Sequence, residues 1–114
     1  MTMDIIKVPV SPGEVLDKIT ILEIKSERIS DAAKLANVQR ELELLQAAWR
    51  QCVEDDETVQ RIHSELKTIN EALWEIEDDI RDKERAREFD QRFIDLARSV
   101  YVTNDQRAEA KKEL

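Results

Sequence analysis

The fold is decided by residues 59–80, which read VQRIHSELKTINEALWEIEDDI. Seven apolar side chains in this stretch follow one another at alternating steps of three and four: Val59, Ile62, Leu66, Ile69, Leu73, Ile76 and Ile80. This spacing places them along one side of an α-helix. Another part of a protein has to cover such a continuous apolar stripe. The stretch therefore predicts a long helix that packs against a partner.

A second stretch with the same spacing of apolar residues lies just upstream, at Leu35, Val38, Leu42, Leu45, Trp49 and Cys52. A short acidic run, residues 54–57, separates the two stretches. Two striped helices joined by a short polar turn indicate an antiparallel helical hairpin of coiled-coil character, with helices at about 32–53 and 57–86. The single cysteine, Cys52, is predicted to be buried in the stripe as a small apolar residue.

Two further helices are expected to flank this hairpin. The first, at about 12–29, starts with a Ser11 cap, and its apolar residues lie on two sides, as in a helix held between layers. A strand over residues 19–24 is an alternative, because this run is rich in β-branched residues. The second, at about 90–102, is expected to be capped by Asp90, and residues 103–105 are expected to form a break or a new cap. Residues 106–114 are then either a frayed tail or a helix that depends on a partner.

The N-terminal arm, residues 1–10, is expected to be extended, with a short edge strand as an alternative, since Pro9 interrupts an apolar run. The sequence thus predicts one all-α domain over residues 1–114.

With 39% charged residues and a net charge of -8, the chain does not suit a nucleic-acid backbone. No segment is apolar enough to span a bilayer, no secretion signal is expected, and one cysteine cannot form an intrachain disulfide. These features predict a cytoplasmic protein without nucleic-acid or membrane partners.

No metal site, cofactor or catalytic residue is predicted. Helical di-metal sites use Glu-x-x-His motifs from facing helices, and the one histidine, His63, has no glutamate three residues before it. A phosphate-binding loop needs several glycines, whereas this chain has only Gly13. The sequence does not decide whether the chain is an enzyme, although it favours a protein without catalytic activity.

Several polar and aromatic residues are candidates for binding a ligand. Trp74 follows the stripe residue Leu73 and falls outside the stripe, so something is expected to cover it. With Trp74 as an apolar wall and Arg81 as an anion clamp, a second group near residue 101 could complete a small pocket. The candidates are Lys25, Trp74, Glu77, Arg81, Arg98, Tyr101, Asn104 and Asp105. The alternative is purely structural: helix packing over Trp74 and i, i+4 ion pairs.

Three strings carry a resemblance to a known family: VPVSPGEVLDKITILEIK at 8–25, NEALWEIEDDIR at 70–81 and ARSVYVTND at 97–105. Together they resemble a bacterial domain-of-unknown-function family of short proteins, over nearly the whole chain. The resemblance implies no activity. Members of this family are sometimes associated with surface-polysaccharide genes. Residues 17–28 are also similar to the first helix of the all-helical chorismate mutases, which bind a dicarboxylate within a dimer. That family has an arginine ahead of the aspartate, where this chain has Glu14 and Val15.

The function that we expect is that of a helical interaction or oligomerisation module, accessory to surface-polysaccharide metabolism if the resemblance extends so far. A chain of this size has surplus apolar surface at Ile21, Ile24 and Trp74, the predicted interface residues, and a homodimer is the simplest way to cover it. Another protein is the alternative partner. The alternative function is a small helical enzyme or binding protein for an anionic carboxylate or phosphate, with Glu77 or Tyr101 as the acid–base group.

Overall fold

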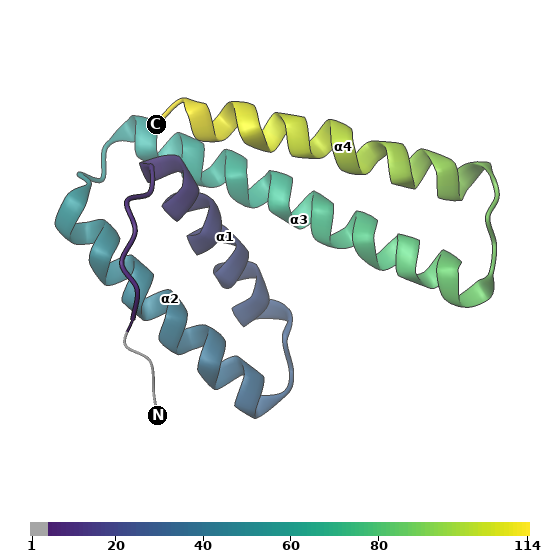
Figure 1. Ribbon diagram of the computed structural model, residues 1–114, viewed down its shortest axis with the longest axis horizontal. Helices are drawn as coiled ribbons and strands as arrows, with labels where there is room; N and C mark the ends of the chain where they lie inside the picture. Colours follow the sequence, from purple (N-terminus) through teal and green to yellow (C-terminus); the bar gives the residue numbers. More distant parts are fainter. Residues whose placement is uncertain (1–4) are drawn as a thin grey trace.

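The computed structural model describes residues 5–114. Its helices are α1 (Pro12–Arg28), α2 (Ala32–Cys52), α3 (Glu57–Ala86) and α4 (Gln91–Lys112). The described residues contain no strand, so the predicted all-α class is confirmed and a strand over residues 19–24 is excluded. The helices form two antiparallel pairs, α1 with α2 and α3 with α4. The pairs meet where α2 leads into α3 and diverge from there in a V (Figure 1).

A side-chain oxygen caps the start of each helix, because the first amides of a helix have no carbonyl partner within it. Ser11 accepts from the Glu14 amide at 3.4 Å, and Asp90 accepts from the Phe93 amide at 3.0 Å, as the sequence predicts. Asp31 and Asp56 cap α2 and α3 in the same way. These caps account for how closely the predicted and observed helix starts agree.

Helix α1 lies between the other helices and contacts all three of them. It buries Leu16, Ile19, Leu22 and Ile24, which lie on more than one side of the helix. The predicted position between layers is therefore confirmed. Because α1 takes this place, α2 and α3 do not pack along each other, and the predicted pairing of these two helices in a hairpin is wrong. The stripe of α2 faces α1 instead, and that of α3 is covered by α1 and α4.

The core lies where α1, α3 and α4 meet. Leu16, Ile62, Leu66 and Ala110 form a buried cluster, against which Trp49, Ile69 and Leu114 pack from its edge. Helix α2 contributes no buried residue, although it is 21 residues long. Cys52, at its end, is exposed, so the predicted burial of this cysteine is wrong. A stripe that only one neighbouring helix covers remains half-exposed.

Helix α4 continues to Lys112 instead of ending near residue 102, and the predicted break and frayed tail are wrong. Tertiary packing holds this part of the helix, since Ala110 is buried and Leu114 packs on the core cluster. The start of α1 also lies directly against it. A Cβ atom at Gly13 would collide with the backbone carbonyl of Lys111, so only glycine permits this approach of the two helices.

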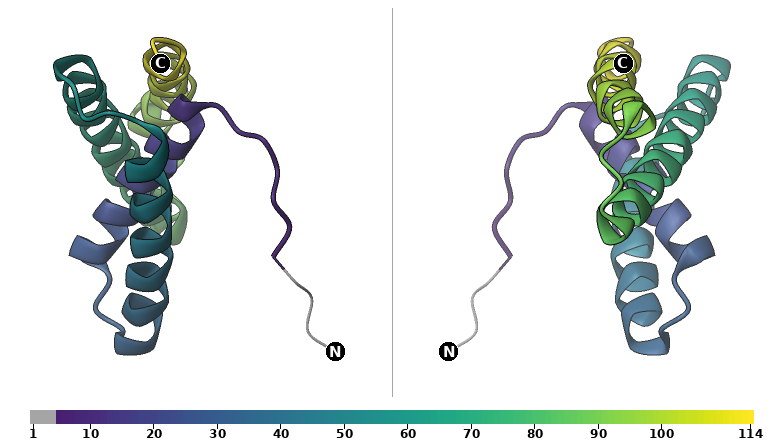
Figure 2. Two further views of the ribbon diagram at one scale, coloured as in Figure 1. Left: turned by 90° about the vertical axis from the view of Figure 1, so that its left-hand side faces the viewer. Right: turned by 90° about the vertical axis from the view of Figure 1, so that its right-hand side faces the viewer.

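The described part of the N-terminal arm, residues 5–10, is extended and forms no edge strand. It runs away from the helices (Figure 2), and its apolar side chains are exposed, Ile5 at 85% and Ile6 at 81%. Among the described residues, no helix has a stretch both long and apolar enough to cross a lipid bilayer.

Candidate functional site

A cavity of about 260 Å³ lies where α1, α3 and α4 face one another, beside the buried core. Three helices line it with a mixture of apolar, basic, acidic and amide side chains. The lining residues are Ile21, Ile24, Lys25, Asn70, Leu73, Trp74, Glu77, Asn104 and Arg107. An aromatic wall combined with a few polar groups is typical of small-molecule sites in helical proteins.

One side of the cavity is anchored by a buried hydrogen-bond network. The Asn70 side chain donates from Nδ2 to Asp17 Oδ1 and to Thr20 Oγ1, both at 2.9 Å. Its Oδ1 accepts from Arg107 Nη1 at 3.2 Å. Asp17, Thr20 and Asn70 are all buried, and the network joins α1, α3 and α4. It therefore fixes the three walls of the cavity relative to one another and holds the Arg107 guanidinium in place.

Ion pairs also join α1 to α3 outside the lining of the cavity. The Lys67 ammonium lies 2.6 Å from Glu27, and the hydrogen bond between them raises the pKa of Lys67. The imidazole of His63 lies 2.7 Å from Glu23, and this hydrogen bond raises the pKa of His63. Nearer the cavity, the Arg28 guanidinium lies 5.8 Å from the centre of the Trp74 ring, within the range of a cation–π contact.

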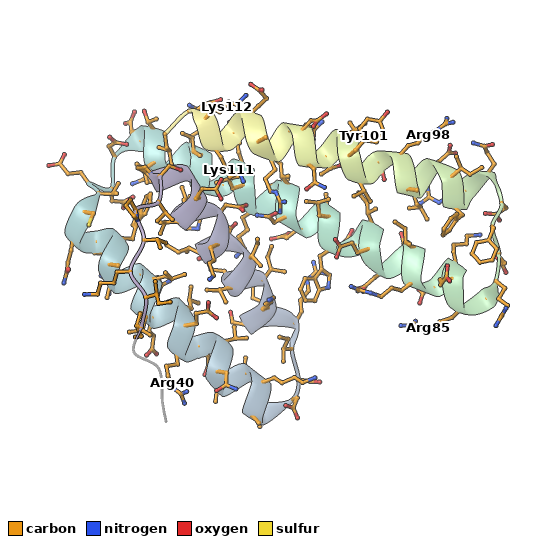
Figure 3. The ribbon with its side chains drawn as sticks, viewed as in Figure 1. Arg40, Arg85, Arg98, Tyr101, Lys111 and Lys112 are labelled. Atoms are coloured by element: carbon orange, nitrogen blue, oxygen red, sulfur yellow. The ribbon has the colours of Figure 1, made fainter. Side chains whose placement is uncertain are left out.

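Four of the eight predicted ligand-binding residues meet in this cavity: Lys25, Trp74, Glu77 and Asn104. The other four do not line it. The Arg81 side chain is 61% exposed and pairs with Glu77 and Asp78 of its own helix. Arg98 and the 60%-exposed Tyr101 lie on the outer side of α4 (Figure 3), so Arg81 and Arg98 do not converge. Asp105 lines a different groove.

The predicted interface residues also lie around this cavity. Ile21 and Trp74 are half-buried and line it. Ile24 is 1% exposed, because the neighbouring helices of the same chain cover it. It is therefore not available to a second molecule in this conformation.

Two residues of the site were not among the predicted ones, Asn70 and Arg107. Asn70 falls between the stripe residues Ile69 and Leu73, and its amide is a recognisable polar intrusion beside an apolar stripe. Arg107 follows Asn104 by three residues, which places both on one helical face only if α4 continues. The wrongly predicted break at 103–105 concealed this relation.

Two other hollows lie outside this site. The larger, about 810 Å³, is an open groove between α3 and α4 whose rim carries Glu65, Asp105, Glu109 and Glu113. Arg61 already neutralises part of this charge, because it pairs with Glu65 and with Glu113. The smaller, about 450 Å³, lies near the turn between α3 and α4. No cluster of three potential metal-binding side chains occurs within residues 5–114.

The fold and the cavity define the chain as an all-α protein in which three helices surround a small site of mixed polarity. The chain belongs to the family of unknown function DUF6165, whose family model matches residues 6–114. The predicted membership of an uncharacterised family is thereby confirmed. No curated protein and no solved structure matches the chain.

Proposed function

We propose that the protein works as a self-associating helical module, in which α2 and the N-terminal arm of one chain pack against a second copy. The observation that carries this proposal is the poor burial of α2 within one chain. It spans 21 residues, carries a regular apolar stripe and buries no residue. On its outer surface Leu44 is 63% exposed.

The total surface supports this proposal. The chain exposes 8405 Å², whereas a compact monomer of its mass exposes about 6,400 Å². Its radius of gyration is 16.5 Å, against about 13 Å for a compact domain of this length. A stable interface buries about 800 Å² on each partner. The surplus of about 2,000 Å² is therefore large enough to supply one.

The distribution of charge favours a second copy as the partner. The chain as a whole carries a net charge of -8. Helix α2 has three basic and two acidic side chains, a net charge of +1, and Lys7 is the one charged residue of the arm segment 5–10. These are the places where two acidic molecules can approach each other with the least repulsion. A two-fold pairing of α2 with α2 then covers the same surface on both chains.

Sedimentation equilibrium at micromolar concentration tests this proposal. The wild-type chain is expected to be a dimer, and Leu44→Glu, which places a charge on the outer face of α2, is expected to be a monomer. Ile94→Glu on α4 is the matched control, because Ile94 is an exposed apolar residue of the other helix pair and its substitution should leave the dimer intact. A monomeric wild-type chain, or a Leu44→Glu variant that stays dimeric, would contradict the proposal.

The arm is tested separately with Ile5→Ser combined with Ile6→Ser. Both side chains are exposed and contribute nothing to the buried core of the chain, so the variant should keep its melting temperature when dilute. Weaker dimerisation is expected if the arm packs on the second copy. An unchanged dimer constant would remove the arm from the proposed interface.

A second candidate function is the binding of a small anionic metabolite. The specific observation that favours it is the meeting of Lys25, Trp74, Glu77 and Asn104 in one cavity. Of the two predicted acid–base groups, Glu77 lines the cavity, whereas Tyr101 lies on the outer side of α4 (Figure 3) and is not supported in this role. The expected link to surface-polysaccharide metabolism stays a prediction.

A further inference from the structure

Lys25 and Arg107 differ from the other partly buried basic side chains of residues 5–114. Each of the others forms an ion pair with a carboxylate, namely His63, Lys67, Lys83 and Lys111. The basic side chains without an ion pair elsewhere in these residues are exposed. Only Lys25 and Arg107 are both half-buried and without a carboxylate partner, and both line the same cavity.

This combination is unusual in a chain with 26 acidic and 18 basic residues. A half-buried cation loses part of its hydration, and a neighbouring carboxylate normally compensates for that loss. At this cavity neither cation forms an ion pair, and the one carboxylate of the lining, Glu77, pairs with Arg81 instead. Their positive charge therefore faces a space that an anion can enter.

The network beneath the cavity prepares Arg107 for this role. One of its nitrogen atoms donates to Asn70 Oδ1 at 3.2 Å, and Asn70 is itself held by Asp17 and Thr20. A guanidinium has five N–H donors in a fixed plane, so most remain available. An arginine whose orientation is already fixed loses little entropy on binding, which favours recognition of a carboxylate or phosphate.

The remaining walls restrict the ligand. Trp74, Leu73 and Ile21 provide an aromatic and apolar side, and the volume of about 260 Å³ corresponds to the share of about nine water molecules. Glu77 also lines the cavity, and its nearest cation, Arg81, is 3.8 Å away. A ligand with a second negative charge near Glu77 would be repelled.

We propose that the cavity between α1, α3 and α4 binds a small organic anion in which a single carboxylate or phosphate is attached to a ring. Lys25 and Arg107 bind the anionic group with the help of the Asn104 amide, and the ring lies against Trp74. The proposal rests on the second candidate function and not on self-association.

The test uses benzoate and phenyl phosphate as ring-bearing probes, inorganic phosphate as the anion alone and benzyl alcohol as the ring alone. The chain has two tryptophans, so a nitrogen–proton NMR spectrum contains two indole signals, which a Trp49→Phe variant assigns. Trp49 lies outside the cavity and serves as an internal control. At millimolar concentration at least one ring-bearing anion should shift the Trp74 signal and leave that of Trp49 in place, and which one does so identifies the anionic group. Benzyl alcohol should have no effect, and inorganic phosphate should act more weakly.

Three variants assign the binding to the two cations. Lys25→Gln and Arg107→Gln should each weaken binding of the effective probe at least tenfold. Arg98→Gln is the matched control, because Arg98 is an unpaired arginine of α4 that points outward, and it should bind like the wild-type chain (Figure 3). Arg107→Gln also removes a hydrogen bond of the network, whereas the Lys25 side chain forms no hydrogen bond or ion pair with the described residues. Lys25→Gln therefore separates loss of binding from loss of folding.

The proposal is overturned if neither benzoate nor phenyl phosphate moves the Trp74 signal, or if Arg98→Gln weakens binding as much as Lys25→Gln does. Repeating the titration on Leu44→Glu distinguishes this failure from that of self-association. Binding that persists in the monomeric variant supports a site within one chain. Binding that is lost there, with the fold intact, contradicts it.

Discussion

Helices α2 and α3 carry apolar stripes of the same spacing and have opposite surroundings. In α3, Ile62 and Leu66 are completely buried, because α1 and α4 pack on this helix from two sides. In α2, no residue is buried, because only α1 packs on it. The comparison teaches that a heptad-like stripe predicts that a helix face needs a cover, while the number of neighbouring helices decides how complete that cover is.

The largest expected effect is the loss of a buried leucine from α3. Leu66→Ala should lower the free energy of unfolding by about 3–4 kcal/mol, since it leaves a cavity in the core. Leu42→Ala, at a half-buried stripe position of α2, should cost about 1 kcal/mol in a dilute monomer. Urea denaturation of both variants measures the difference. Equal losses would break the comparison, because they would mean that the two stripes are equally covered.

The cover over α3 depends on the close approach of α1 and α4 at Gly13. Gly13→Ala would force its new methyl group against the backbone of Lys111, which cannot move without shifting α4. We expect a loss of about 2–3 kcal/mol, typical of overpacking. Circular dichroism melting curves should show a lower melting temperature. An unchanged value would show that α4 does not pack tightly on α1.

A smaller effect concerns the ion pairs that link α1 to α2 and to α3. Helix α1 is tied to α2 by the pair Lys18–Glu41 and to α3 by several pairs, including His63 with Glu23. The pKa of His63 is raised above 6.5 by the hydrogen bond to Glu23. This contribution to stability is therefore complete below about pH 6.5 and is lost as the pH rises through the raised pKa. Because both groups reach solvent, it amounts to at most about 1 kcal/mol.

His63→Gln is the variant that checks this contribution. His63 is the only histidine of the chain, so the wild-type chain should lose stability relative to the variant between mildly acidic and mildly alkaline solution. Urea denaturation across this pH range measures the difference. A difference that is constant with pH, or that grows as the pH rises, would contradict the assigned pair.

The smallest expected effect lies where the two helices end. Helix α2 is followed by Val53 in extended backbone, whereas α3 is followed by Arg87 with a φ of 55°, a left-handed conformation that suits glycine better. Arg87→Gly should raise the stability by about 0.5–1 kcal/mol, because it removes the strain of a Cβ atom there. Val53→Gly is the control and should destabilise the chain. A loss of stability in Arg87→Gly would contradict the assigned conformation.

The sequence predicted the helices well and their packing less well. Local signals, such as the Ser11 and Asp90 caps, determine where helices begin, and the two-sided pattern of α1 correctly placed it between layers. The pairing of α2 with α3 was wrong because a stripe does not identify its partner. The end of α4 was wrong because Ala110 and Leu114 are held by residues far away in the sequence, which a local pattern does not contain.

About half of the residues of the candidate site could be predicted, because a local sequence pattern shows unusual side chains but not which helices meet. Lys25, Trp74 and Glu77 stood out because polar or aromatic side chains lay beside apolar stripes. Arg81 and Arg98 were both candidates for the pocket, but Arg81 pairs within its own helix and Arg98 points outward. Arg107 entered the site because α4 continues, so its role followed from tertiary structure alone.

Hydrogen exchange at two protein concentrations tests the central claim most directly. If the stripe of α2 is half-covered in one chain and is closed by a second copy, the amides of α2 should exchange much faster than those of α3 in dilute solution and should slow as the concentration rises. The amides of the middle of α3 should exchange slowly at both concentrations. Amides in α2 that are as protected as those of α3 in dilute solution, or that do not respond to concentration, would contradict the account.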